Sequence, residues 1–289
     1  MRKGLVLAGG LGSRLHPVTL SVSKQLLPIY DKPTIYYSLS ILFLAKISEI
    51  AIITSKEHLG LYKNLLGDGK QFGVSFNYIV QEHPGGIAEA YILAEDFLCG
   101  CPSALILGDN FFYGDEFKTK LLDTNSKYER SSIFCYRVKH PENFGILEVD
   151  NQGQPRSIVE KPPHYLSDMA VTGLYFLDGT ASDRAKKLKP SARGELEITS
   201  LLQCYLEDEQ LDFEELGRGY TWFDTGSADN LLAVSNFVKA IQDRHGFQIA
   251  CLEEIALHNG WITHDSLIES TLTMGKSAYR EYLEKIWNK

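Results

Sequence analysis

Glycines and cationic side chains near the start of the chain form a pattern that can hold a phosphate. Gly9, Gly10 and Gly12 carry no side chain, so backbone N–H groups there can approach an anion closely. Arg14 follows with a planar guanidinium whose donors match phosphate oxygens, and Lys24 adds a second cation. We predict a polyphosphate-binding loop, although the stretch alone is equally compatible with a plain glycine turn beside two surface cations.

Two familiar phosphate-binding motifs do not fit this loop. No Gly-Lys pair followed by Ser or Thr closes it, which excludes an ordinary P-loop ATPase. The dinucleotide fingerprint is half met by Gly10 and Gly12, but Leu15 stands where its third glycine belongs and Pro17 interrupts the following helix. A hydride-transfer enzyme of the Rossmann type is therefore disfavoured.

Two aspartates follow apolar stretches and are candidate metal ligands. Asp109 comes just after the apolar run at residues 103–107, where a carboxylate can coordinate a cation beside a polyphosphate. Asp224 is the second candidate, because Ser227 is available to cap the helix expected from about residue 228. A capping role for either aspartate is the alternative.

The residue patterns of several hydrolytic chemistries are missing from the sequence. The eight histidines include no H-E-x-x-H motif and no obvious pairing for zinc. No Gly-x-Ser-x-Gly motif surrounds a serine. These observations argue against a zinc hydrolase and against covalent acyl chemistry.

The composition indicates an ordinary globular protein with an acidic surface. The chain has 289 residues, 44% of them hydrophobic, and its net charge of −8 has the wrong sign for binding nucleic acid or an anionic membrane. The five cysteines show no C-x-x-C spacing, which predicts reduced thiols in a cytoplasmic protein. We find no signal-peptide region, and no apolar run approaches the ~20 residues that span a bilayer.

Apolar runs alternate with helix-forming stretches in the first part of the chain. The runs predicted as strands cover residues 4–8, 49–54, 75–80 and 103–107. The stretches predicted as helices cover residues 34–46, 58–66 and a segment ending near residue 97. Such alternation is typical of a Rossmann-like, doubly wound α/β sheet flanked by helices. The phosphate loop and Asp109 would then lie at the carboxyl ends of strands, where such sheets bind ligands.

After about residue 130 the pattern changes to short strands joined by turns. Strands are expected at residues 131–138, 145–150, 156–160 and 171–177, which predicts an inserted antiparallel portion that makes the sheet mixed. The acidic run at residues 194–199 is predicted to be helical, as is the C-terminal part from residue 228. Glu160 and Lys161 are neighbours at a strand end, so they can address one ligand only if Pro162 and the proline after it make that end irregular.

Seven motifs in one order resemble those of the sugar-nucleotidyltransferase family. They are the glycine loop, SKQLLPIYDKP, LILGDNFFYGD, IVEKPP, AVTGLYF, KPSARGELEIT and YTWFDTG. The resemblance implies a nucleotidyltransferase core at residues 1–241, with a nucleotide-binding half at 1–130 and a sugar-phosphate-binding half at 131–227. It also implies a C-terminal helical segment, residues 242–289, packed on that core.

The resemblance further implies roles for individual residues. The implied nucleotide-binding residues are Leu7, Gly9, Gly10, Gly12, Ser13, Arg14, Lys24, Gln25, Gln81, Gly86 and Asp109. The implied sugar-binding residues are Asn110, Gly145, Glu160, Lys161, Val171, Thr172 and Arg193. The implied catalytic residues are Arg14, Lys24, Lys161 and Arg193. The implied ligands of Mg²⁺ are Asp109 and Asp224.

The reaction that the resemblance implies is transfer of a thymidylyl group from dTTP to α-D-glucose 1-phosphate, the first step of dTDP-deoxysugar synthesis, by a homotetramer. Both substrates are polyanions, so cations must neutralise the repulsion between their phosphates. A phosphate monoester is already ionised at neutral pH, so no catalytic His or Cys is needed. One alternative is uridylyl or cytidylyl transfer to another hexose 1-phosphate. The other is a non-catalytic regulatory homologue. Such a homologue would not need all of Arg14, Lys24, Asp109, Lys161 and Asp224, so their joint presence argues against it.

Two parts of the chain depart from the family pattern. The segment after Ile241 follows it only loosely, and one short stretch differs in sequence. The helix after Pro84-Gly85-Gly86 reads IAEA where the family more often has LAQA. Glu89 therefore brings a carboxylate to the side on which the nucleoside is expected, and it bears on base preference.

Overall fold

The computed structural model describes residues 1–10 and 12–287, so Leu11 of the phosphate loop and the last two residues of the predicted C-terminal segment lie outside the described residues. The parallel part of the central sheet is formed by β1 (Lys3–Leu7), β4 (Glu49–Thr54), β5 (Ser75–Val80) and β6 (Ser103–Leu107). β1 lies between β4 and β6, and β5 lies beyond β4. The chain thus reverses its direction of growth across the sheet between β1 and β6, and ligands bind at such switch points.

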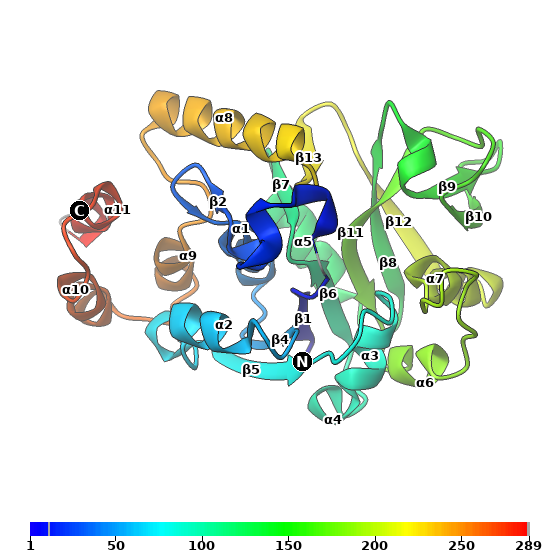
Figure 1. Cartoon of the computed structure of the whole chain (residues 1–289), viewed down its shortest axis with the longest axis horizontal. Helices are drawn as coiled ribbons and strands as arrows, with labels where there is room; N and C mark the ends of the chain where they lie inside the picture. Colours follow the sequence, from blue (N-terminus) through cyan, green and yellow to red (C-terminus); the bar gives the residue numbers. More distant parts are fainter. Residues whose placement is uncertain (11, 288–289) are drawn as a thin grey trace.

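The second half of the chain extends the sheet with strands of mixed direction (Figure 1). These strands are β8 (Ser131–Arg137), β9 (Gly145–Val149), β10 (Pro155–Glu160), β11 (Met169–Leu177) and β12 (Leu211–Leu216). β11 pairs antiparallel with β6, β8 and β9, whereas β12 pairs parallel with β8. The predicted mixed α/β sheet with an antiparallel portion is therefore confirmed.

Helices cover both faces of this sheet. They are α1 (Thr34–Leu44), α2 (Leu59–Leu66), α3 (Glu89–Leu93), α4 (Glu95–Leu98), α5 (Phe117–Ser126), α6 (Ala181–Ala185) and α7 (Ile198–Glu207). Successive residues of β1 point to opposite faces: Val6 packs in one buried cluster with Leu39 of α1, and Leu5 packs in another with Leu201 of α7. Because both faces are buried, the inner strands β1 and β6 are nearly continuous apolar runs. The edge strand β5 alternates instead, with Ser75 and Asn77 exposed and Phe76 buried.

The C-terminal part is helical, as predicted. It comprises α8 (Ala228–His245), α9 (Leu252–His258), α10 (His264–Leu272) and α11 (Ala278–Trp287). Ser227 caps α8 by accepting a hydrogen bond from the N–H of Asn230 at 3.2 Å, and Gly246 ends it in a left-handed conformation with φ 70°. In Figure 1 α9 lies beside α1, to which Asn259 connects it by donating to the carbonyl of Phe43 at 2.8 Å. The predicted boundary at residue 241 falls inside α8.

The structure differs from the sequence prediction at two places that shape the site. The helix predicted over residues 194–199 is wrong, because α7 begins at Ile198 and Glu197 is extended, with φ −72° and ψ 137°. The other difference is a strand pair that the pattern did not indicate, β7 (Asn110–Gly114) with β13 (Tyr220–Asp224). None of the helices in the described residues combines the length and apolar character that crossing a bilayer requires.

Candidate active site

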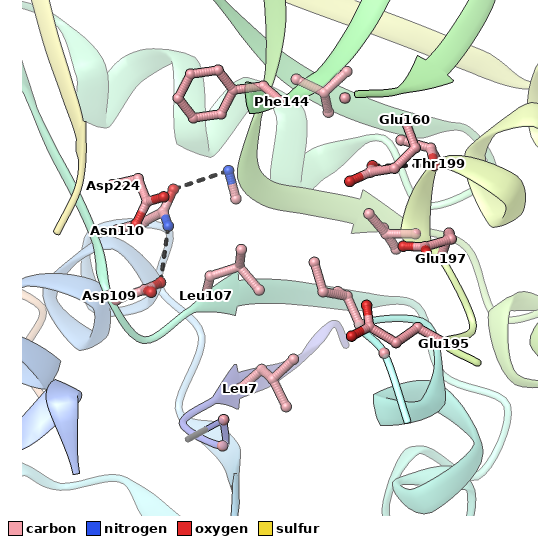
Figure 2. A pocket seen from close by; sticks show the side chains of 18 of the residues that line it. Leu7, Leu107, Asp109, Asn110, Phe144, Glu160, Glu195, Glu197, Thr199 and Asp224 are labelled. Atoms are coloured by element: carbon pink, nitrogen blue, oxygen red, sulfur yellow. Dashed lines mark hydrogen bonds between the residues drawn. The ribbon is translucent and has the colours of Figure 1, made fainter. Parts of the chain in front are cut away.

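A pocket of about 390 Å³ opens at the carboxyl ends of β1 and β6. Figure 2 shows Asp109, Asn110 and Asp224 on one side of it, Glu160, Glu195 and Glu197 on the other, and Leu7 and Leu107 below. Most of the predicted site residues line this pocket: Leu7, Gly9, Gly10, Arg14, Lys24, Gln25, Gln81, Gly86, Asp109, Asn110, Gly145, Glu160, Lys161, Val171, Arg193 and Asp224.

The glycine loop joins β1 to a short helical turn, Ser13–Leu15. Gly10 and Gly12 have positive φ angles of 96° and 58°, which glycine adopts without strain. Thr19 holds the loop by donating from its hydroxyl to the carbonyl of Gly12 at 2.7 Å. Gly12 and Ser13 do not line the pocket. The loop therefore presents Gly9 and Gly10 to a ligand, while Gly12 and Ser13 shape the turn.

The pairing of β7 with β13 brings the two aspartates together. Asp224 lies opposite Asn110 in this strand pair. Thr225 fixes the neighbouring backbone, because both its N–H and its hydroxyl donate to the carbonyl of Asp109, at 3.0 and 2.8 Å. Two carboxylates that are far apart in the sequence thus reach the same wall of the pocket.

Two cations accompany the aspartates. The ammonium group of Lys24 donates a hydrogen bond to Asp109. The guanidinium of Arg14 lies 3.8 Å from the carboxylate of Asp224 and is 71% exposed. Lys24 is therefore held at the wall of the pocket, whereas Arg14 reaches over its open side.

The electrostatics of this group make the two carboxylates unequal. Burial opposes the ionisation of Asp109, but the charge and hydrogen bond of Lys24 outweigh it and hold the pKa of that carboxyl below its usual value. Burial and the negative charge of Asp109 raise the pKa of Asp224. Burial would lower the pKa of Lys24, yet the carboxylates of Asp109 and Asp224 raise it. A bound cation would relieve the repulsion between the carboxylates.

Asn110 connects the two sides of the pocket wall. Its Oδ1 accepts from the indole N–H of Trp222 at 2.7 Å and from the backbone N–H of Gly173 at 3.1 Å. Its Nδ2 donates to Asp109 at 3.1 Å. The amide therefore fixes Asp109 relative to β13 and β11.

The opposite wall carries the residues predicted to hold a sugar phosphate. β10 ends at Glu160, and Lys161 follows with a positive φ of 42°, so the strand end is irregular and both side chains face the pocket. Arg193 contacts the carboxylates of Glu160 at 3.3 Å and Glu197 at 2.8 Å. Burial and the charge of Glu197 raise the pKa of Glu160.

Thr172 is the predicted sugar-binding residue that the structure does not bring to the pocket. It is fully buried and its hydroxyl donates to the carbonyl of Phe134 at 2.8 Å. Its neighbour Gly173 lines the pocket instead. Sequence reasoning also missed several lining residues, namely Asn143, Phe144, Tyr175, Glu195, Glu197, Thr199 and Trp222. For Glu195 and Glu197, the acidic run that follows Arg193 in the sequence could have indicated a place in the site.

Doubly wound sheets bind ligands at their switch point, and a pocket of opposed cations and carboxylates there suits a nucleotide or another phosphate compound. Residues 3–241 match the sequence model of the family described as nucleotidyl transferase. The chain belongs to this family and is therefore a nucleotidyl-transferring enzyme.

Relatives that match nearly the whole chain share one name within the family. The glucose-1-phosphate thymidylyltransferase of Neisseria meningitidis serogroup A is 49% identical over 287 residues, covering 99% of this chain and 100% of that one. The protein of the same name from Xanthomonas campestris is 49% identical over 282 residues, covering 98% and 96%. A Bacillus anthracis structure provisionally given this name and solved with sucrose has a TM-score of 0.76 at 40% identity, over 82% of this chain and 95% of that one.

Proposed function

We propose that this chain transfers a thymidylyl group from dTTP to α-D-glucose 1-phosphate, forming dTDP-glucose and pyrophosphate as the first step of dTDP-deoxysugar synthesis. The observation that carries the proposal is that two pairs of cations, Arg14 with Lys24 and Lys161 with Arg193, line one pocket. A transfer between two phosphates needs two such sets, because each substrate is an anion. The names of near-full-length relatives supply the base and the sugar.

The proposed division of labour follows the walls of the pocket. Lys161 and Arg193 hold the sugar phosphate as the nucleophile, while Arg14 and Lys24 hold the triphosphate and neutralise the charge that grows at the α-phosphorus during in-line attack. Other residues that line the pocket would recognise the two substrates. The nucleoside would contact Gln25, Gln81 and Gly86, and the sugar would contact Asn110, Gly145, Glu160 and Val171.

Mg²⁺ is the proposed metal, and Asp109 and Asp224 are the residues that would hold it. Both offer carboxylate oxygens, which are the ligands that this hard cation prefers. Within the described residues no group of three or more His, Cys, Asp and Glu is arranged to hold a metal, so phosphate oxygens of the substrate would complete the coordination. When bound, the metal supplies charge neutralisation for the triphosphate and for the departing pyrophosphate.

A cytoplasmic homotetramer is the proposed working form. The family resemblance supports both the compartment and the tetramer, and the lack of C-x-x-C spacing in the sequence favours a reducing compartment.

A pyrophosphate-release screen tests the proposed function. The purified chain is supplied with Mg²⁺ and with each combination of dTTP, UTP, dCTP and ATP with glucose, galactose, mannose or N-acetylglucosamine 1-phosphate. We expect dTTP with glucose 1-phosphate to give the highest kcat/KM. A higher value for another pair, or no release with any pair, would refute the proposal.

A further inference from the structure

Glu89 supports the pocket from behind without lining it. Its neighbour Gln81 lines the pocket and is 7% exposed, and the side-chain Nε2 of Gln81 donates to Oε2 of Glu89 at 2.6 Å. Glu89 occupies the first position of α3, immediately after the turn that contains Gly85 and Gly86. A carboxylate thus stands directly behind the amide that faces the nucleoside side of the pocket.

The carboxylate determines which end of the Gln81 amide can turn toward it. A carboxylate only accepts hydrogen bonds, so the NH₂ group of Gln81 must face Glu89 and the carbonyl Oε1 must face away. On that other side Oε1 lies against the phosphate loop: a Cβ built on Gly9 would come within 2.6 Å of it. Gln81 therefore presents its carbonyl acceptor beside the loop that lines the pocket, while one N–H of its amide is bound to Glu89.

The turn holds Glu89 in this position. A Cβ on Gly85 would overlap the carboxylate of Glu89, so the side chain lies directly against the turn backbone. The turn is itself tied to the neighbouring segment, because the N–H of Leu196 donates to the carbonyl of Gly85 at 2.7 Å and the N–H of Ala88 donates to the carbonyl of Leu196 at 3.1 Å. The carboxylate is thus packed between the turn and Gln81.

We propose that Glu89 is a positioning residue for base selection: it fixes Gln81 so that Oε1 accepts a hydrogen bond from the base. The inference rests on the proposed function and deepens it. Thymine and uracil offer an N3–H donor on their pairing edge, whereas N3 of cytosine is an acceptor that would face Oε1 without a proton between them. The pair therefore selects pyrimidines with an N3–H.

The test compares dTTP with dCTP at saturating glucose 1-phosphate and Mg²⁺. In Glu89→Gln the new amide can either accept from Gln81 or donate to it, so both orientations of Gln81 become possible. We expect the ratio of kcat/KM for dTTP to that for dCTP to fall by about tenfold, the size expected for one unmatched polar contact. Most of the change should come from better use of dCTP, an improvement that simple structural damage would not produce.

Three further variants make the test specific. Glu89→Ala removes the constraint without introducing a new donor and should lower the same ratio, which keeps the test decisive if Glu89→Gln folds poorly. Glu82→Gln is the matched control, because it removes one negative charge from an exposed side chain next to Gln81. Its ratio should equal that of the wild type. In a Gln81→Ala background, Glu89→Gln should leave the ratio unchanged, since the amide that it orients is gone.

The possible results separate this inference from the proposed function. A ratio that stays within twofold of the wild type in both Glu89 variants, or that falls equally in Glu82→Gln, would overturn the role of Glu89. A wild-type enzyme that prefers dCTP would overturn it as well. A wild-type enzyme that prefers UTP to dTTP would refute thymidylyl transfer but support the role of Glu89, because uracil carries the same N3–H.

Discussion

Replacing Asn110 with alanine should lower the stability of the protein by an amount that can be worked out from its contacts. The Oδ1 of Asn110 accepts from the indole N–H of Trp222 and from the backbone N–H of Gly173, at 2.7 and 3.1 Å. Gly173 lies where the pairing of β11 with β8 is interrupted between Val171 and Tyr175. The side chain of Asn110 thus takes the place of a sheet partner.

The alanine variant leaves two buried donors without an acceptor. Each orphaned donor costs about 1–3 kcal/mol, so the expected loss in the free energy of unfolding is roughly 2–6 kcal/mol. A protein of this size loses about 2 °C of melting temperature per kcal/mol, which corresponds to a drop of roughly 4–12 °C. Trp222→Phe alone removes the indole donor and leaves the bond between Asn110 and Gly173. Loss of the indole hydrogen bond should cost about 1 kcal/mol, besides any loss of packing.

Thermal and urea unfolding of the wild type, both single variants and the double variant provide the measurement. In the double variant Asn110→Ala/Trp222→Phe the indole donor no longer exists, so one of the two orphaned groups is removed. The two changes should therefore couple by about 1 kcal/mol or more, with the double variant more stable than the sum of the single losses. A loss below about 1 kcal/mol for Asn110→Ala, or strict additivity, would show that the amide does not satisfy these donors.

Three further predictions concern catalysis and pH dependence. Asp109→Asn and Asp224→Asn should each abolish most Mg²⁺-dependent pyrophosphate release while the melting curve stays cooperative; full activity in either would remove it from the metal site. Lys161→Ala should raise the KM for glucose 1-phosphate by roughly tenfold or more, because a charge-assisted contact is lost; an unchanged KM and kcat would contradict its role. Burial raises the pKa of Glu253 above its usual 4.5, so the folded state holds this proton more tightly and loses stability as pH rises through the raised pKa. Glu253→Gln cannot ionise and can still accept the hydrogen bond of Tyr279, so it should not lose this stability. In urea unfolding, the stability of Glu253→Gln relative to the wild type should therefore be greater at pH 8 than at pH 5. The same difference in free energy of unfolding at the two pH values would refute the argument.

The parallel part of the fold could be predicted because its physical signals are local. An apolar run bounded by glycine, such as β1, reads as a buried strand, and the end of such a strand is where a ligand approaches. The same reasoning placed Asp109 at the edge of the sheet. The cap of α8 by Ser227 was equally local, since it depends on residues within one helical turn.

The features that the sequence did not indicate all depend on distant partners. The segment before α7 is rich in helix-forming residues, but the backbone of Leu196 hydrogen-bonds to Gly85 and Ala88 and not within a helix. The strands β7 and β13 are more than 100 residues apart in the sequence, and no local residue pattern indicates that they pair. Thr172 faces the core because its position in β11 turns its hydroxyl toward Phe134, and a motif alone does not show that direction.

The contact between the turn and Leu196 also explains how two substrates can be aligned. The turn at Gly85 and Gly86 supports the side of the pocket proposed for the nucleoside. Leu196 lies three residues after Arg193, which the proposed mechanism assigns to the sugar phosphate. Gly86 has a φ of 100°, and a Cβ there would overlap the backbone of Leu196, so the two segments pack as closely as backbones can. In-line transfer requires the reacting atoms to approach within about 3–3.5 Å. We infer that backbone hydrogen bonds between the two halves hold the subsites at a set separation, so that the alignment of the substrates is built into the fold.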